Sequence, residues 1–267
     1  MKRAFNFTRK TFLEFIKDPV LTVVSVLFPI VYILLLTFIN KSWGRECEFL
    51  KLRALIPGSM VVSSALVMYF MAALVSKDRK SSLLKRLYVS PMRTPEFLFG
   101  YVMLGIVVGL VQLILCDIFG LIVAAAYHES YMSAGQGTLL VLSQIPILLA
   151  LIFFGILLGS LLNDKAAPGV CAIILILVGL LGGCFFGLEA ADEFETFARC
   201  LPFYPSVYIG RIITHAEMTP PTLYPTQKYY YEWNSIASIG LGTIFIYLAF
   251  NVTLANVVIT RPCKKQY

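Results

Sequence analysis

Six long stretches of apolar residues constrain this chain more than any other feature of its sequence. They cover residues 20–39, 54–75, 97–127, 138–162, 166–188 and 236–259. A helix needs about 20 apolar residues to cross the hydrocarbon of a bilayer. Five of the stretches contain no charged residue, and the third contains only Asp117. We therefore expect an all-α integral membrane protein with six transmembrane helices, built as a single domain over residues 1–267.

Positive charge predicts the orientation of these helices. With the N-terminus inside, 15 of the 22 Lys and Arg residues fall on the cytoplasmic side, and the opposite orientation places only 7 there. Since Lys and Arg concentrate in cytoplasmic loops, we expect both termini in the cytoplasm and the chain in the plasma membrane. Anionic lipid then accounts for the net charge of +7, and no nucleic-acid partner is expected.

The segment before the first stretch has the pattern of a helix lying on the membrane surface. Basic residues in it provide positive charge for lipid headgroups, and an ordinary basic tail is the alternative. No small-residue cleavage site follows the first stretch, so we interpret that stretch as a membrane helix rather than a signal peptide. The apolar side chains expected to share one face of the surface helix are Phe5, Phe12, Phe15 and Ile16.

Residue patterns typical of catalysis or metal binding are missing from the sequence. It contains no GxxxxGK[ST], HExxH, GxSxG or CxxC motif, so we expect neither an enzyme, nor a metal site, nor a cofactor held by this chain. Two of the six cysteines, Cys47 and Cys200, fall in segments expected outside. A disulfide between them and two free thiols both remain open.

The loop between the second and third stretches, residues 77–96, predicts a helix, a break and a second helix. Ser90 and Pro91 end the first helix, since the residue before proline disfavours the α region. Thr94 then caps the second, with Pro95 at its first position. A short projection of this kind suits docking onto another protein, although a helix resting on lipid headgroups has the same pattern. The apolar stripe of the first helix is Leu83, Leu84, Leu87 and Tyr88.

Several short motifs, taken in order along the chain, resemble the permease subunits of type-two ABC exporters, including the daunorubicin-resistance-like drug exporters. The motifs are Asp18-Pro19 before the first stretch, LIPG at 55–58, KRLYVSPMR at 85–93, FLFG at 97–100 and LPFYP at 201–205. The resemblance implies that two permeases pair, either as a homodimer or with a related chain. Two separate ABC ATPase subunits would dock beneath them and bind ATP and Mg.

The same resemblance assigns roles to segments and residues. The loop at 77–96 would act as a coupling helix toward the ATPase, and the segment between the fifth and sixth helices would fold back into the outer leaflet. The coupling role falls on Leu83, Leu87, Ser90, Pro91 and Arg93.

The second and fifth helices would line the substrate path. Gln112 and Asp117, in the third stretch, are further candidates, because a carboxylate inside a membrane costs about 2.5–3.5 kcal/mol and must face protein or water. The structural alternatives are a hydrogen bond to a neighbouring helix, or a position near enough to the outer interface to be hydrated, as for Asp117 past the middle of its span. The path candidates on the second and fifth helices, whose Met and Phe side chains suit an apolar ligand, are Ser64, Met68, Phe185 and Phe186.

The expected function is the membrane subunit of an exporter for an amphipathic or hydrophobic substrate, such as a drug, a lipid-like molecule or a peptide. Export of a glycan or glycolipid is one alternative. A membrane sensor or immunity protein that binds a hydrophobic ligand without pumping is another. A membrane enzyme acting on lipid is the weakest, since the spans lack a catalytic constellation.

Overall fold

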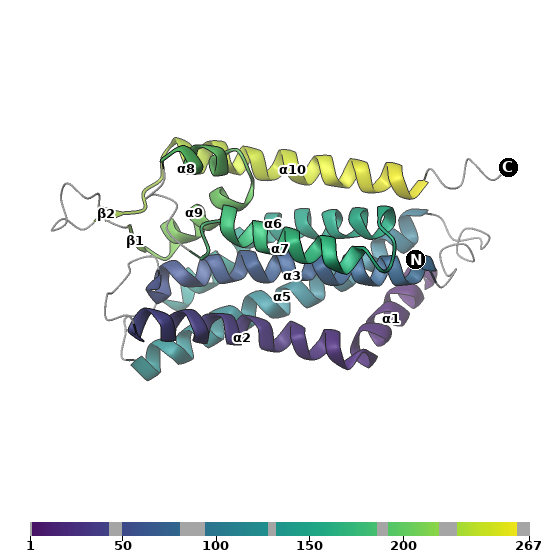
Figure 1. Cartoon of the computed structure of the whole chain (residues 1–267), viewed down its shortest axis with the longest axis horizontal. Helices are drawn as coiled ribbons and strands as arrows, with labels where there is room; N and C mark the ends of the chain where they lie inside the picture. The colour runs from purple at the N-terminus through teal and green to yellow at the C-terminus, as the bar shows by residue number, and fades with distance from the viewer. Residues whose placement is uncertain are drawn as a thin grey trace.

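The computed structural model describes residues 2–42, 50–80, 94–127, 132–185, 192–218 and 229–260. These ranges are almost entirely helical, with one two-stranded antiparallel sheet in which Glu217 pairs with Tyr230. Most of the helices run along the long axis of the molecule (Figure 1). The elements are α1 (Lys2–Lys17), α2 (Pro19–Ser42), α3 (Leu52–Lys80), α5 (Thr94–Tyr127), α6 (Ala134–Leu161), α7 (Ala167–Leu181), α8 (Asp192–Arg199), α9 (Phe203–Ile213), β1 (Glu217–Met218), β2 (Tyr229–Tyr230) and α10 (Ser235–Thr260).

Five helices among the described residues are long and apolar enough to cross a membrane: α2, α3, α5, α6 and α10. The prediction of six full-length spans is confirmed for these five. The stretch at 166–188 instead forms the shorter apolar helix α7, of 15 residues. Gly182 caps α7, and Gly183 follows with a φ of 67°, a conformation that glycine adopts without strain. The helix therefore ends although the next residues are still apolar.

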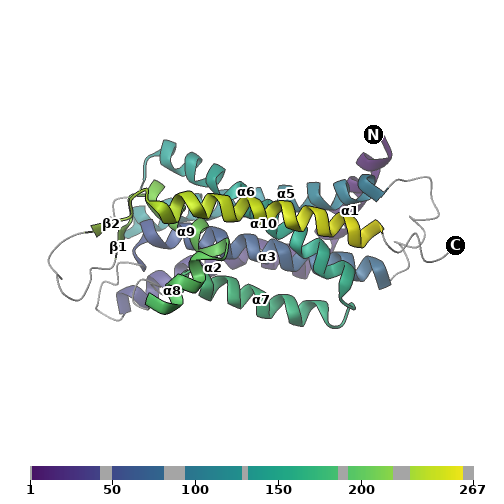
Figure 2. The same cartoon turned by 90° about the horizontal axis from the view of Figure 1, so that it is seen from above.

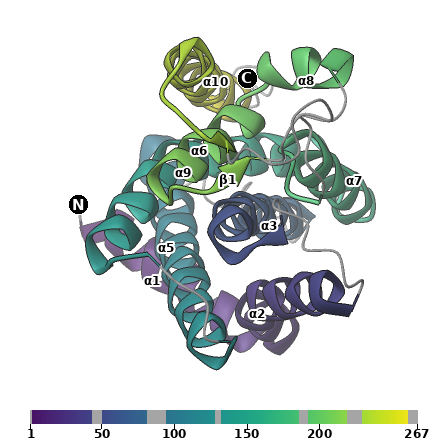
Figure 3. The ribbon, with the colours of Figure 1, turned by 90° about the vertical axis from the view of Figure 1, so that its left-hand side faces the viewer.

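Helix α3 lies in the middle of the bundle, with α2, α5, α6 and α7 around it (Figure 3). Its most apolar window is 89% buried, compared with 28% for α2 and 17% for α10. Glycines let α6 approach α3 closely: a Cβ on Gly155 would lie 2.4 Å from the carbonyl oxygen of Met68. The outer helices thus present apolar surface suited to lipid, and α3 forms the core.

Helix α1 confirms the predicted N-terminal helix but corrects its faces. Phe15 is buried and meets Phe70 edge-on, and Phe7 packs against Tyr101 of α5. The remaining predicted face, Phe5, Phe12 and Ile16, is exposed. The buried stripe repeats every four residues through Phe7, Thr11 and Phe15, so Phe15 belongs to the packed side.

The two ends of the bundle carry different elements. The start of α1 and the end of α10 lie at one end, which we name the α1 end. Helices α8 and α9 and the β1–β2 pair lie at the other, which we name the α9 end (Figure 2).

Candidate functional site

Helix α9 enters the bundle at the α9 end and is enclosed by the chain's own helices. All residues from Phe203 to Arg211 are buried. Pro202 and Pro205 suit the start of a helix, where the backbone N–H is not needed. Close approaches hold α9 in place: a Cβ on Gly210 would lie 2.6 Å from Pro57, and one on Gly240 would lie 2.2 Å from Pro205. The segment thus packs inside the protein, and its return into the outer leaflet stays a prediction.

Arg211, at the inner face of α9, is the largest of the fully buried side chains among the described residues. Its guanidinium donates to the carbonyl of Gly183 at 2.8 Å, to the hydroxyl of Tyr231 at 3.1 Å and to the carbonyl of Ala54 at 3.4 Å. It also lies 5.4 Å from the centre of the Tyr231 ring. Arg211 lies between the fifth and sixth apolar stretches, where the predicted orientation places an external segment, whereas the structure makes it a junction between α3, α7 and α9.

The carbonyls just beyond α7 are satisfied from two sides. A helix end leaves its last carbonyls without intrahelical donors. Arg211 supplies the donor for Gly183, and the hydroxyl of Tyr32 on α2 donates to the carbonyl of Cys184 at 3.0 Å. Both contacts let an irregular backbone exist inside an apolar bundle, where it must be buried in protein and hydrogen-bonded.

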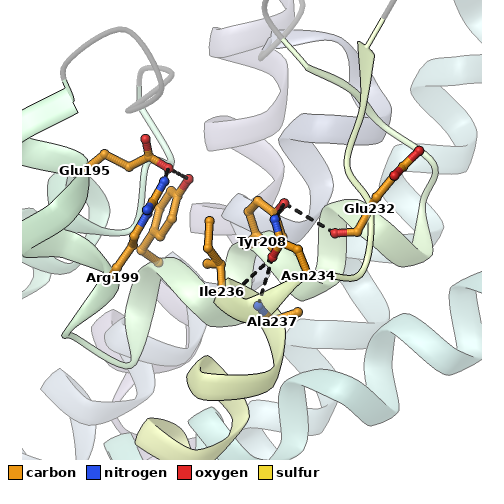
Figure 4. A network of polar contacts seen from close by, with 8 residues as sticks. Glu195, Arg199, Tyr208, Glu232, Asn234, Ile236 and Ala237 are labelled. Carbon is orange, nitrogen blue, oxygen red and sulfur yellow. Dashed lines mark hydrogen bonds and ion pairs between the residues drawn. The ribbon is translucent and has the colours of Figure 1, made fainter.

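A second set of contacts joins α8, α9 and α10 (Figure 4). Glu195 accepts a hydrogen bond from Tyr204 at 2.8 Å and pairs with Arg199 at 2.9 Å. Asn234 donates to the hydroxyl of Tyr208 at 2.8 Å. Its side-chain oxygen accepts from the backbone N–H groups of residues 236 and 237 and so caps the start of α10. Helix α9 is therefore hydrogen-bonded both to α8, which precedes it in the chain, and to the start of α10, which follows it.

Two backbone carbonyls lack their usual helical N–H donor because a proline lies four residues later. Side chains from other segments of the chain donate to them instead. Pro29 has no N–H for the carbonyl of Ser25, four residues earlier. The side-chain amide of Gln112 on α5 donates to that carbonyl at 3.0 Å. The amide oxygen of Gln112 is buried without a hydrogen-bond partner in the described part of the chain. In the same way Pro57 frees the carbonyl of Arg53, which accepts from the hydroxyl of Thr214 at 2.7 Å.

The candidate path residues lie in several different surroundings. Ser64 and Met68 are fully buried inside α3, and the Ser64 hydroxyl donates to the carbonyl of Met60. They reach a path only if the helices around α3 move apart. Asp117 is partly exposed. A Cβ on Gly137, in the first turn of α6, would lie 2.7 Å from its carboxylate. A helix N-terminus favours negative charge, so this position supports the structural alternative for Asp117.

Phe185 belongs to a half-buried aromatic group that we name the α2–α7 aromatic face, made of Phe28, Tyr32 and Phe185. Tyr32 stacks on Phe28 with ring centroids 6.2 Å apart and meets Phe185 edge-on at 5.8 Å. The structure thus brings Phe185 together with two aromatic residues of α2 and not with Ser64 or Met68. Phe186 lies outside the described residues.

The coupling candidates Leu83, Leu87, Ser90, Pro91 and Arg93 also lie outside the described residues, and so does Cys47. Cys200 is an exposed free thiol. Among the residues that the structure describes, no cluster of His, Cys, Asp and Glu could hold a metal ion.

One family matches most of the chain. Its description is ABC-2 type transporter, and the match covers residues 4–214. The chain belongs to this family. A search of curated proteins gave no match. The protein is accordingly a multi-pass membrane protein and the non-catalytic permease component of an ABC transporter. ABC-2 permeases pair with ABC ATPase subunits, which bind the ATP.

Sequence reasoning missed the residues that organise the α9 end. Arg211 and Tyr231 both lie between the fifth and sixth apolar stretches, and the carbonyls that Arg211 binds on α3 and beyond α7 are 157 and 28 residues away in sequence. A signal was present for two contacts, since a proline inside a helix leaves one backbone carbonyl without its usual donor. Pro29 lies inside a span and has no N–H, so the carbonyl of Ser25 lacks its usual helical donor. A polar side chain in another span, such as that of Gln112, can then donate to this carbonyl.

Proposed function

We propose that this ABC-2 permease exports an amphipathic or hydrophobic substrate from the cytoplasm, powered by a separate ATPase, in the manner of the daunorubicin-resistance-like exporters. The observation that carries the proposal is the family match over residues 4–214. The motif order supports the finer assignment to drug-type exporters. The chain forms one permease domain over residues 1–267, and a second permease, identical or related, completes the transporter.

In this proposal the α1 end faces the cytoplasm of the cell, and the membrane is the plasma membrane. The α1 end carries the basic residues of α1 and the basic turn that closes α3. Because anionic lipids and the positive-inside rule both favour Lys and Arg on the cytoplasmic side, this end belongs inside. The α9 end then lies in the outer leaflet, where α9 closes the exit.

The α2–α7 aromatic face supports the choice of cargo. It presents three half-buried aromatic rings, two from α2 and one from the segment just after α7. Aromatic rings provide large apolar contact area, and the Tyr32 hydroxyl adds a polar tip. A drug-like or lipid-like molecule fits such a surface better than a glycan, which needs many polar partners. Phe185 is therefore the path candidate that the geometry favours most.

The experiment is purification of the tagged chain from its native membrane in mild detergent, followed by assay of the eluate for a P-loop ATPase and ATP hydrolysis. We expect a stoichiometric ATPase. A folded permease that elutes alone, without ATPase activity, would overturn the proposal and favour a ligand-binding sensor or immunity protein.

A variant of the coupling loop sharpens this test. Leu83→Asp together with Leu87→Asp places two charges on the apolar stripe, and we expect the ATPase to be lost while membrane insertion is retained. Ser82→Asp is the control, because it adds a carboxylate to the same loop away from the stripe. If the doubly charged variant retains the ATPase at full stoichiometry, the coupling role assigned to this loop is wrong.

A further inference from the structure

The last turn of α3, residues 77–80, contacts a different part of the protein with each of its four side chains. Lys77 pairs with Asp18, at the break between α1 and α2, at 3.7 Å. Asp78 accepts a hydrogen bond from the hydroxyl of Tyr101 on α5 at 2.6 Å. These two contacts tie the end of α3 to the N-terminal helices and to α5.

The other two side chains of the turn reach toward α6 and α7. Arg79 donates to the carbonyl of Ser160 in the last turn of α6. Lys80 pairs at 2.7 Å with Asp164, in the turn between α6 and α7. Four consecutive residues of one helix therefore hold α1, α2, α5, α6 and the start of α7.

The burial of the side chains indicates which of these contacts contributes most to stability. The side chains of Lys77 and Lys80 are 68% and 66% exposed, and exposed ion pairs contribute little to stability. The Asp78–Tyr101 contact is buried, with residue exposures of 8% and 1%. A buried hydrogen bond is costly to break, because the group that loses its partner has no water to replace it. Asp78 and Tyr101 therefore form the main fastening.

Tyr101 also connects the turn to α1. Phe7 meets the Tyr101 ring edge-on, with centroids 5.2 Å apart, and a Cβ on the neighbouring Gly100 would lie 2.4 Å from the Phe7 ring. Deeper in the bundle, Gly155 and Gly159 bring α6 against the carbonyls of α3. Close-packed elements of this kind move as units rather than deform continuously.

We infer that residues 77–80 act as a transmission clasp, which passes displacement of the loop beginning at residue 81 to α1, α5 and α6 together. Tyr101 and Asp78 are its positioning residues. The inference rests on the proposed function, since it supplies the path by which ATPase closure reaches the spans. It adds residues to that path: they lie at the start of the 77–96 loop, before the five coupling residues named from the family resemblance.

The test uses the complete permease–ATPase complex in lipid nanodiscs. Tyr101→Phe removes only the hydroxyl that Asp78 accepts. The readout is hydrogen exchange of α5 and α6 amides with and without ATP trapped by vanadate, together with the ATPase rate and the subunit stoichiometry. Tyr69→Phe is the control, because it makes the same chemical change on α3, where Tyr69 contacts the ring of Phe70.

We expect Tyr101→Phe to keep the ATPase bound and hydrolysing, while the nucleotide-dependent exchange difference in α5 and α6 falls about tenfold, as removal of one partner from a buried hydrogen bond would give. Tyr69→Phe should retain the full difference. An undiminished difference in Tyr101→Phe overturns the clasp. Absence of a bound ATPase from the wild-type chain would instead refute the proposed function, so the two failures are distinguishable.

A second variant keeps the inference testable if Tyr101→Phe fails to fold. Lys80→Gln removes an exposed ion pair, and we expect it to reduce the exchange difference two- to threefold around the α6–α7 turn. Lys165→Gln removes an exposed charge from the same turn and should change nothing. Equal behaviour of these two lysine variants would also overturn the clasp.

Discussion

Replacing Arg211 with methionine tests whether the inserted helix α9 is held by its buried guanidinium. Methionine is apolar and unbranched and reaches as far as the ε position, so it replaces the stem of the arginine and removes the donors. The carbonyl of Gly183 and the hydroxyl of Tyr231 then lose their partner inside the bundle.

The expected loss follows from the contacts. Two of the three hydrogen bonds are at 3.1 Å or less, and Arg211 is only 1% exposed. Leaving a buried polar group without its partner costs about 1–3 kcal/mol, and Arg211→Met removes the donor from three acceptors. At roughly 2–4 °C per kcal/mol for a chain of this size, the melting temperature should fall by about 10 °C. The melting temperature of Arg211→Lys should lie between those of wild type and Arg211→Met, since a lysine ammonium cannot reach all the acceptors that the planar guanidinium does.

The assay is the midpoint of thermal aggregation in mild detergent, followed by size exclusion. Arg9→Met is the matched control, because Arg9 is exposed on α1, and we expect a shift below about 2 °C for a surface substitution. If Arg211→Met melts as close to wild type as the control does, the junction assigned to Arg211 is wrong.

Two further predictions use the same thermal assay. Gln112→Leu should cost about 1 kcal/mol through the lost bond to Ser25, and Pro29→Ala in the same chain should abolish that cost, because residue 29 then donates to Ser25 itself. An equal cost with and without Pro29 would contradict this account of Gln112. Gly155→Ala should cost about 1–3 kcal/mol by overpacking, since its Cβ would lie 2.4 Å from the backbone of α3. Gly242→Ala, whose Cβ would meet nothing within 4 Å, should be neutral, and equal losses at the two glycines would refute the close-approach argument.

The length of the apolar stretches was enough to predict five membrane helices and their order. The stretch at 166–188 shows where that reasoning fails. Hydropathy measures whether residues favour lipid, and it carries no information about a backbone turn among apolar residues. The helix ends because Gly183 takes a positive φ, and the carbonyls it exposes are tolerated only because Tyr32 and Arg211 supply donors. Those partners are 152 and 28 residues away in sequence.

The candidate site was predictable in part. Gln112 was correctly singled out as a polar residue inside a span, and its observed bond to Ser25 matches the structural alternative stated for it. The transport role assigned to it stays a prediction. The contacts of residues 77–80 could not be predicted, because a run of charged residues after a span has the same sequence pattern whether its side chains face water or bind other parts of the protein. Only the folded arrangement shows that each side chain has its own partner.

The short helix α7 has a consequence for the surrounding bilayer. Its 15 residues rise about 22 Å, whereas the hydrocarbon of a typical bilayer is about 30 Å thick. Helix α10, with 26 residues, rises about 39 Å. Lipid thus meets a hydrophobic belt of unequal height around the protein, and acyl chains beside α7 must shorten or tilt to match it. The permease is thereby sensitive to membrane thickness on the side where α7 faces outward, and a thinner bilayer relieves the mismatch there.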